Sequence, residues 1–166
     1  EIYDRLVGSE MCIRDSYAIE EFLPKDKVLS SLEDYKGVKR RFETIFENDN
    51  FKLIDDFAHH PTAIDETIKM ATEQTDNLIL IIELGSNSMK KGIHDERLLN
   101  IFKNQNVYTI NASANQRKIF AHHAQELTKA DVAKICTTEA KKKTILMCGN
   151  RNFQGFQKLI LDELIK

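Results

Sequence analysis

The feature that most constrains the fold of this chain is the near-continuous apolar run LILIIEL at residues 78–84. A short run that is apolar at odd and even positions alike is typical of a strand buried on both faces, as in a parallel sheet covered by helices. A membrane-spanning helix needs about 20 apolar residues in a row, far more than this stretch offers. The run therefore predicts the centre of a covered sheet, and no membrane partner is expected.

Strand-like and helix-like segments alternate around this run. Residues 42–57 show period-two alternation about an Asn-Asp-Asn turn, which predicts a β-hairpin. Further strands are expected at residues 107–110 and 144–147, and helices at residues 61–71, 95–103, 116–127 and from 153 onward. This alternation predicts an α/β fold, a Rossmann-like, mostly parallel sheet flanked by helices with an N-terminal β-hairpin.

Composition narrows the function classes. The formal net charge is -2, with 24 Lys and Arg against 26 Asp and Glu, so the chain lacks the basic excess of a nucleic-acid-binding domain. No secretory apolar region opens the chain, which predicts a cytoplasmic protein. Residues 1–16 (EIYDRLVGSEMCIRDS) have neither a helical nor a strand period and resemble translated sequencing-adaptor read-through, so a non-native tail is expected there. A helical stretch is expected over residues 17–32.

The unusual residues gather in the loops that follow the expected strands. In parallel α/β sheets, ligands bind outside the carboxyl ends of the strands, where loops lead into helices. Here those loops are residues 55–61, 85–92, 111–116 and 148–155. This coincidence predicts a binding site at one edge of the sheet.

Two polar clusters carry chemistry suited to a nucleotide. Residues 37–41 (GVKRR) offer guanidinium groups whose planar donors match phosphate oxygens, although a solvated basic surface is the alternative. Residues 55–64 (DDFAHHPTAI) place acids and imidazoles where a helix begins and can bind an anion, with simple helix capping as the alternative. His59 and His60 are adjacent and point to opposite faces of an extended segment, so no metal site is predicted.

With this spacing, the two clusters resemble the opening of the third domain of the Mur ligases. The resemblance covers roughly residues 29–166 and implies an enzyme that joins an amino acid or peptide to a UDP-muramic acid precursor, through an acyl-phosphate made with ATP. It also implies that residues 17–36 are a remnant of the preceding central domain or linker and that residues 37–166 are the carboxy-terminal domain.

Within the family, DDFAHHPTAI together with SNSMKKG at residues 86–92 most resembles the branch that joins a recycled murein tripeptide to UDP-N-acetylmuramate. The branch that adds L-alanine to the same precursor shares the HHPT element and is the alternative. A stand-alone nucleotide- or peptide-binding module that borrowed the fold is a second alternative, since a fold does not fix a function.

The resemblance implies a role for each matching residue. Arg41 would reach the ATP phosphates, Asp56 would bond the ribose, and His59 would lie beside the phosphates or the reacting carboxylate. Arg41 and His59 are thus the expected catalytic residues. The residues expected to bind the acceptor substrate are Ser86, Asn87, Met89, Lys90, Asn150 and Phe153.

Two departures from the family pattern stand out. Relatives commonly carry Pro-Arg where this chain has Leu84 and Gly85, so an arginine is lost and Lys90 or Lys91 would have to compensate. The usual glycine-rich SNGGFGG-like turn is GNRNFQG here, at residues 149–155, with Arg151, Asn152 and Gln154 in place of glycines.

No G-x-x-x-x-G-K-[ST] phosphate loop occurs in the 166 residues. Mur ligases hold that loop and the Mg²⁺ ligands in the central domain, so the resemblance implies that ATP and Mg²⁺ bind largely outside this chain. The expected partners are the missing N-terminal and central domains of the same chain, together with UDP-N-acetylmuramate and the tripeptide. The chain alone is expected to be inactive.

Overall fold

The computed structural model describes residues 27 and 38–166. The chain divides into two compact units, residues 1–43 and 44–166. The expected tail over residues 1–16 and, apart from Lys27, the expected helix over residues 17–32 lie outside the described residues. None of the described helices is long and apolar enough to cross a membrane.

The described residues form a six-stranded sheet in the order β1-β2-β6-β3-β4-β5. The first two strands are antiparallel, and every other neighbouring pair is parallel, which confirms the predicted fold class. Their bounds are β1 Glu43–Glu47, β2 Phe51–Asp56, β3 Leu78–Glu83, β4 Asn106–Ile110, β5 Ala124–Glu126 and β6 Lys143–Cys148.

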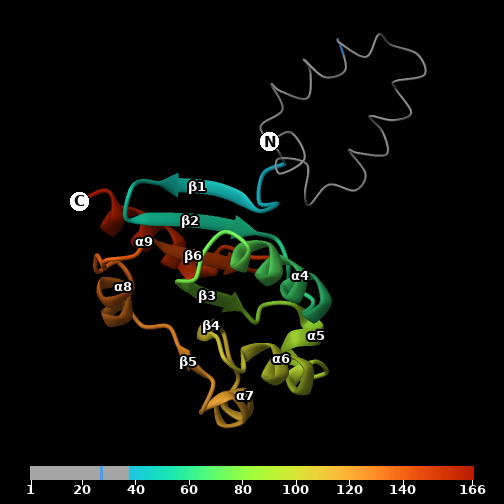
Figure 1. Cartoon of the computed structure of the whole chain (residues 1–166). Helices are drawn as coiled ribbons and strands as arrows, with labels where there is room; N and C mark the ends of the chain where they lie inside the picture. Colours follow the sequence, from blue (N-terminus) through green and yellow to red (C-terminus); the bar gives the residue numbers. More distant parts are fainter. Residues whose placement is uncertain (1–26, 28–37) are drawn as a thin grey trace. The chain divides into compact units, whose positions relative to one another are not determined.

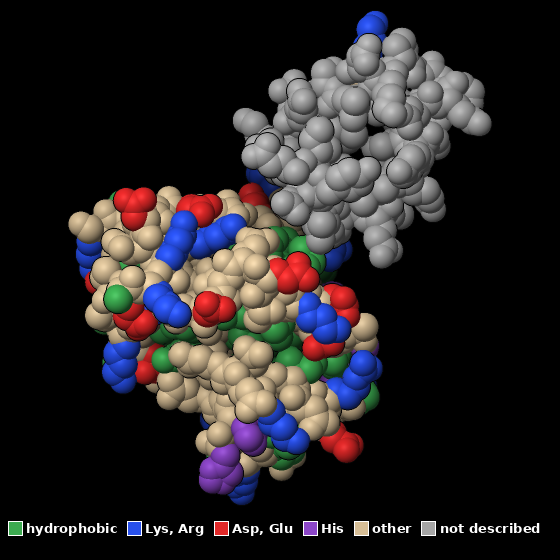
Figure 2. Space-filling view, viewed as in Figure 1, with side chains coloured by type: hydrophobic (Ala, Val, Ile, Leu, Met, Phe, Trp, Pro, Cys, Tyr) green, Lys and Arg blue, Asp and Glu red, His purple; other side chains and the backbone are tan. Residues whose placement is uncertain are grey.

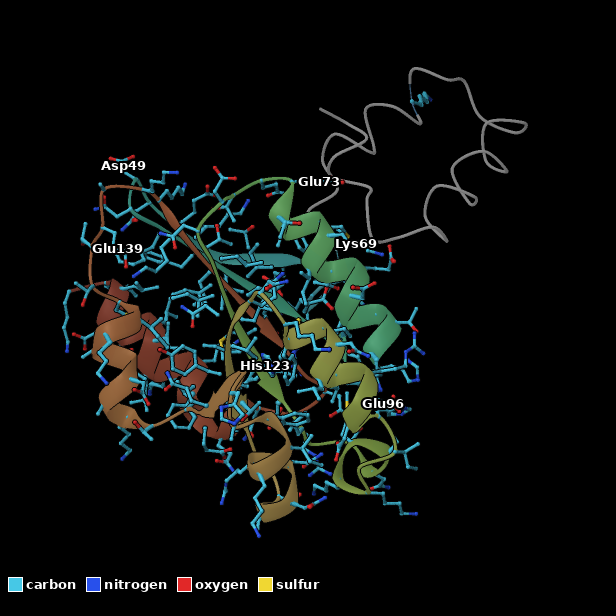
Figure 3. The ribbon with its side chains drawn as sticks, turned by 60° about the horizontal axis from the view of Figure 1, so that its bottom comes forward. Asp49, Lys69, Glu73, Glu96, His123 and Glu139 are labelled. Atoms are coloured by element: carbon cyan, nitrogen blue, oxygen red, sulfur yellow. The ribbon has the colours of Figure 1, made fainter. Side chains whose placement is uncertain are left out.

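Helices cover both faces of the sheet (Figure 1). α8 (Lys129–Ile135) and α9 (Phe156–Leu164) lie on one side, and α9 follows the short 3₁₀ turn η1 (Phe153–Gly155). α4 (Pro61–Thr72) and α6 (Asp95–Phe102) lie on the other side, as Figure 3 also shows. Within residues 38–166 the remaining helices are α5 (Asn87–Lys90) and α7 (Ala114–Phe120), and the Phe120 ring of α7 packs edge-on against Phe102 of α6.

Apolar packing on both faces of the sheet explains the continuous apolar runs in the sequence. All six residues of β6 are buried, because this strand lies between β2 and β3 and is covered on both faces. Ile145 and Met147 belong to the core cluster that includes Ile160 and Leu164 of α9. The intervening Leu146 is fully buried and, by the alternation of a strand, faces the α4 and α6 layer.

Local sequence signals predicted the hairpin and α4 correctly. In the turn between β1 and β2, the Asn48 side-chain oxygen accepts the backbone N–H groups of Asn50 and Phe51 at 2.9 and 2.7 Å. α4 begins with Pro61, whose missing N–H costs nothing at the first helical position. Its expected apolar stripe, Ile64, Ile68 and Ala71, is buried.

The helix expected over residues 116–127 was wrong in its second half. α7 ends at Phe120, and the His123 N–H closes a turn onto the Phe120 carbonyl at 2.8 Å. Residues 124–126 then form β5, which pairs in parallel with β4 from Val107↔Ala124 onward. The open edge of β4 offers ladder hydrogen bonds to this segment, and they outweigh its helical spacing of apolar residues.

Candidate functional site

We call the carboxyl edge the four loops that follow β2, β6, β3 and β4, namely residues 55–61, 148–155, 84–92 and 111–116. The parallel register brings the strand ends together, since Asp56 of β2 and Ile82 of β3 both pair with Cys148 of β6. The loops singled out from the sequence therefore do meet at one edge of the sheet. Whether they form a ligand site remains a prediction.

A buried carboxylate organises this edge. Glu83, the last residue of β3, is 1% exposed. Its Oε1 accepts from the Asn111 side-chain amide at 3.3 Å, and its Oε2 accepts from the Arg151 backbone N–H at 3.1 Å. Glu83 thus joins three of the four loops. Sequence reasoning missed it, although an acid inside the apolar run LILIIEL was a visible signal, because such an acid must find partners when buried.

The loop after β6 fits tightly against this carboxylate. A Cβ on Gly149 would lie 2.7 Å from the Glu83 Cβ and 2.9 Å from the Phe153 ring, so no side chain fits there. The Gly149 N–H donates to the Asp56 carbonyl at 3.0 Å. Gly149 is therefore needed for the close approach of β2, β3 and the 148–155 loop.

The 148–155 loop holds its shape with strained residues rather than with the expected run of glycines. Phe153 and Gln154 have φ of 51° and 52°, in the left-handed region that favours glycine. Phe153 is 1% exposed and packs in the core, while the Gln154 amide donates to the Asn111 side-chain oxygen. The Asn150 Oδ1 is buried and has no hydrogen-bond partner within the part of the chain that the structure describes. It is thus an acceptor that a ligand N–H could satisfy.

Asp56 and His59 lie in the loop between β2 and α4. The Asp56 Oδ1 accepts the Ala58 N–H at 2.6 Å, which fixes the turn, and the residue is 7% exposed. The His59 Nδ1 lies 2.9 Å from the Phe57 carbonyl. A carbonyl only accepts, so Nδ1 donates its proton to Phe57, and Nε2 is left available for another partner.

The carboxyl edge does not offer a reactive thiol. Burial raises the pKa of the Cys148 thiol well above its usual value, and the nearby charges of Asp56 and Asp55 raise it further. A thiol held protonated in this way is a poor nucleophile and a poor metal ligand. Among residues 27 and 38–166, no group of three or more His, Cys, Asp or Glu side chains could hold a metal ion.

The loop after β3 contains four of the expected acceptor-binding residues, and they differ in exposure. Ser86 caps α5, its hydroxyl accepting the Met89 N–H at 3.3 Å, while Asn87 and Lys90 are exposed. Met89 is fully buried, and its carbonyl accepts the Gln116 side-chain amide at 2.8 Å. The placement suits Asn87 and Lys90 for contact with a ligand and suits Met89 for packing beneath the loop.

Gln116 is a second residue that sequence reasoning missed. It completes a capping box with Ser113 at the start of α7 and donates to the Asp95 carboxylate at 2.8 Å. Because it also bonds to Met89, it ties α7 to the loop after β3. The S-x-x-Q spacing was a visible sign of the capping box but not of the second pair of bonds.

Arg41 belongs to the other compact unit, residues 1–43. It is exposed, and its backbone N–H closes a turn onto the Val38 carbonyl at 3.1 Å. The neighbouring Arg40 has φ of 58°, and its N–H donates to the Glu43 carboxylate at 2.7 Å. The role expected for Arg41 stays a prediction.

With this geometry established, comparison with known proteins defines the class. Residues 40–152 match the family model described as Mur ligase, glutamate ligase domain. The chain therefore belongs to the Mur ligase family, whose members are ATP-dependent ligases of peptidoglycan synthesis. The family resemblance noted in the sequence is confirmed.

Particular relatives come from two branches of this family. A murein peptide ligase structure from Psychrobacter arcticus is 30% identical over 82% of this chain and 32% of its own, with a TM-score of 0.62. A UDP-N-acetylmuramate-alanine ligase structure from Thermotoga maritima is 17% identical over 88% of this chain and 35% of its own, with a TM-score of 0.66. The UDP-N-acetylmuramate–L-alanine ligase of Desulfitobacterium hafniense is 47% identical over 53 residues, or 32% of this chain and 12% of that protein. This chain thus spans about a third of the solved relatives and less of the curated one.

Proposed function

We propose that this chain is the carboxy-terminal domain of a ligase that joins the murein tripeptide L-alanyl-γ-D-glutamyl-meso-diaminopimelate to UDP-N-acetylmuramate with ATP. The observation that carries the proposal is the likeness to the murein peptide ligase, at 30% identity over 82% of the chain. Over a similar span, identity to the alanine ligase structure is 17%, a level that speaks for the fold alone.

The loop between β2 and α4 is proposed to meet the nucleotide. Asp56 would accept a hydrogen bond from the ribose, and its carboxylate is held in place by the Ala58 N–H. The proton on His59 Nδ1 is held by the Phe57 carbonyl, so Nε2 is the nitrogen that would face a phosphate or the reacting carboxylate. Arg41 would offset the negative charge of the ATP phosphates.

The loops after β3 and β6 are proposed to receive the tripeptide. Ser86, Asn87 and Lys90 would supply hydroxyl, amide and ammonium groups, and Asn150 would accept a peptide N–H at its unpartnered oxygen. Met89 and Phe153 would support these loops from within, since both are buried.

ATP would supply the phosphoryl group that activates the muramoyl carboxylate as an acyl-phosphate, and Mg²⁺ would be held by ligands outside the described residues. The residues of this chain would align the peptide amine with the activated acid and keep water away from it. Alignment of this kind converts a collision between two molecules into a step within one complex, which can lower a barrier by about 7 kcal/mol or more.

The alternative is addition of L-alanine, and it is favoured by the local match to the Desulfitobacterium hafniense alanine ligase, 47% identical over 53 residues. The ligase that carries this chain separates the two in an assay of ATP-dependent product formation with UDP-N-acetylmuramate and either acceptor. We expect kcat/KM for the tripeptide to exceed that for L-alanine by at least about 100-fold, as several added contacts would give. A preference for L-alanine would refute the tripeptide assignment and leave the family intact.

A further inference from the structure

The Arg151 side chain packs against the backbone of Gly85 at the carboxyl edge. A Cβ built on Gly85 would lie 2.8 Å from the Arg151 Cδ, 3.2 Å from its Nε and 3.3 Å from its Cγ. The stem of Arg151 therefore rests directly on the backbone that begins the loop after β3. A side chain at position 85 would require the Arg151 stem to move from this place.

The Arg151 backbone is anchored at the same place. Its N–H donates to Glu83 Oε2 at 3.1 Å, and the preceding turn starts at Gly149, where no side chain fits. An ordinary surface arginine has a mobile stem, and ordering it on a ligand costs side-chain entropy. Here the packing against Gly85 has already restricted the first part of the stem.

The guanidinium group itself is exposed and makes no hydrogen bond or ion pair with any residue that the structure describes. The nearby Glu83 carboxylate is occupied by two neutral donors, the Asn111 amide and the Arg151 N–H. A cation held at a loop edge without a counter-charge is suited to an anion, and a guanidinium matches a carboxylate in a two-bond, planar geometry.

We propose that the Arg151 guanidinium, positioned over Gly85, binds a carboxylate of the incoming acceptor. This inference rests on the proposed function, because it needs an acceptor with a free carboxylate. The family pattern left Lys90 or Lys91 to replace the arginine lost at position 85. The geometry points instead to the other loop, where Arg151 fills the place that a side chain at position 85 would occupy.

The test uses the ligase that carries this chain, with the acceptor that it turns over. In Arg151→Gln, we expect the KM for the acceptor to rise about 10- to 100-fold with little change in kcat, as for lost binding shared by ground and transition states. The KM values for ATP and UDP-N-acetylmuramate should stay unchanged. Lys158→Gln, which removes an exposed cation from α9, is the matched control and should leave all three KM values as they are.

A swap of the two residues tests the shared space. Gly85→Arg alone should displace the Arg151 stem and so raise the acceptor KM, and Arg151→Gly alone should also raise the acceptor KM. The double variant Gly85→Arg/Arg151→Gly should recover an acceptor KM within about threefold of the wild type, since one guanidinium is again present in that space. Circular dichroism melts of each variant would show that the proteins being compared are folded.

An acceptor analogue with its carboxylates amidated supplies the ligand side of the test. The KM difference between wild type and Arg151→Gln should disappear with this analogue. Unchanged acceptor KM in Arg151→Gln, a rise confined to ATP or UDP-N-acetylmuramate, or a double variant no better than Arg151→Gly would each overturn the proposal while the ligase function stands. A wild-type ligase that accepts neither the tripeptide nor L-alanine would overturn the proposed function, and this inference with it.

Discussion

The amino and carboxyl ends of the parallel strands differ in the partners that their charged side chains have. We call the amino edge the residues at the amino ends of the strands, namely 49, 75–77, 104–106 and 137–143. In Figure 3, Asp49 and Glu139 lie at this end of the sheet, and Glu96 lies toward the other end. At the amino edge, charges meet opposite charges: Lys143 pairs with Glu139 at 2.8 Å, and Lys141 approaches Asp76 at 3.9 Å. At the carboxyl edge, the Glu83 charge is met by neutral donors instead.

The comparison distinguishes an edge whose charges stabilise the fold from an edge whose polar groups are available to a ligand. Opposite charges that pair with each other leave little for a ligand. Figure 2 shows Lys and Arg side chains interspersed with Asp and Glu side chains on the face in view. The carboxyl edge holds a buried acid, an unpartnered Asn150 oxygen and three left-handed residues that are not glycine, Asn111, Phe153 and Gln154. Unmet polar groups and backbone strain of this kind concentrate at functional sites.

The largest effect is expected from Glu83→Ala, which removes the acceptor that joins three loops of the carboxyl edge. The free energy of unfolding should fall by about 3 kcal/mol, because the Arg151 N–H and the Asn111 amide lose a charged partner and a cavity remains. Urea denaturation of the chain measures this. Glu83→Gln keeps the volume and one acceptor and should lose roughly half as much. Equal stability of wild type and Glu83→Ala would show that the edge is not organised by this carboxylate.

A smaller loss is expected from Lys143→Met at the amino edge. The Lys143 ammonium is 3% exposed and donates to the Ile135 and Thr137 carbonyls at 3.1 and 3.0 Å, closing the end of α8, as well as to Glu139. Methionine keeps the packing but leaves these acceptors unmet, at a cost of about 2 kcal/mol in the same denaturation experiment. Lys141→Met, on an exposed and loosely paired lysine, should change stability by less than about 0.5 kcal/mol. Similar losses in both variants would contradict this account.

The smallest expected effect is a gain in the free energy of unfolding. Gln154→Gly relieves a left-handed residue at the carboxyl edge and should stabilise the chain by about 0.5–1 kcal/mol, less what the bond to Asn111 contributes. Asn104→Gly at the amino edge, where φ is 66°, should gain less because asparagine tolerates that region better. Thermal melts of the two variants compare them directly. A larger gain at Asn104 would mean that the strain is not concentrated at the carboxyl edge.

The sequence predicted most of the sheet because its signals are local. The runs at 78–84 and 144–147 are apolar at successive positions since β3 and β6 are covered on both faces, and the hairpin has its own asparagine turn. β5 was missed because three residues of an edge strand carry no period that can be read. α8 follows it, and its Thr128–Asp131 capping box was a readable sign that was overlooked.

The candidate site was predictable only as a set of loops. Strand order places loops 55–61, 148–155 and 84–92 side by side, and the sequence indicated which of them hold unusual residues. It could not show that Glu83 accepts from residues 28 and 68 positions away, nor that Gly85 makes room for Arg151. Contacts of that range depend on how the strands are ordered in the sheet, which no local pattern encodes.

The position of β6 also bears on how the chain is made. It is the last of the described strands in sequence, yet it lies between β2 and β3. During synthesis, the β1–β2 hairpin and the β3–β4–β5 group must therefore wait as two separate pieces, each with an exposed edge that can pair with another chain. The sheet can therefore be completed only after residues 143–148 have emerged from the ribosome.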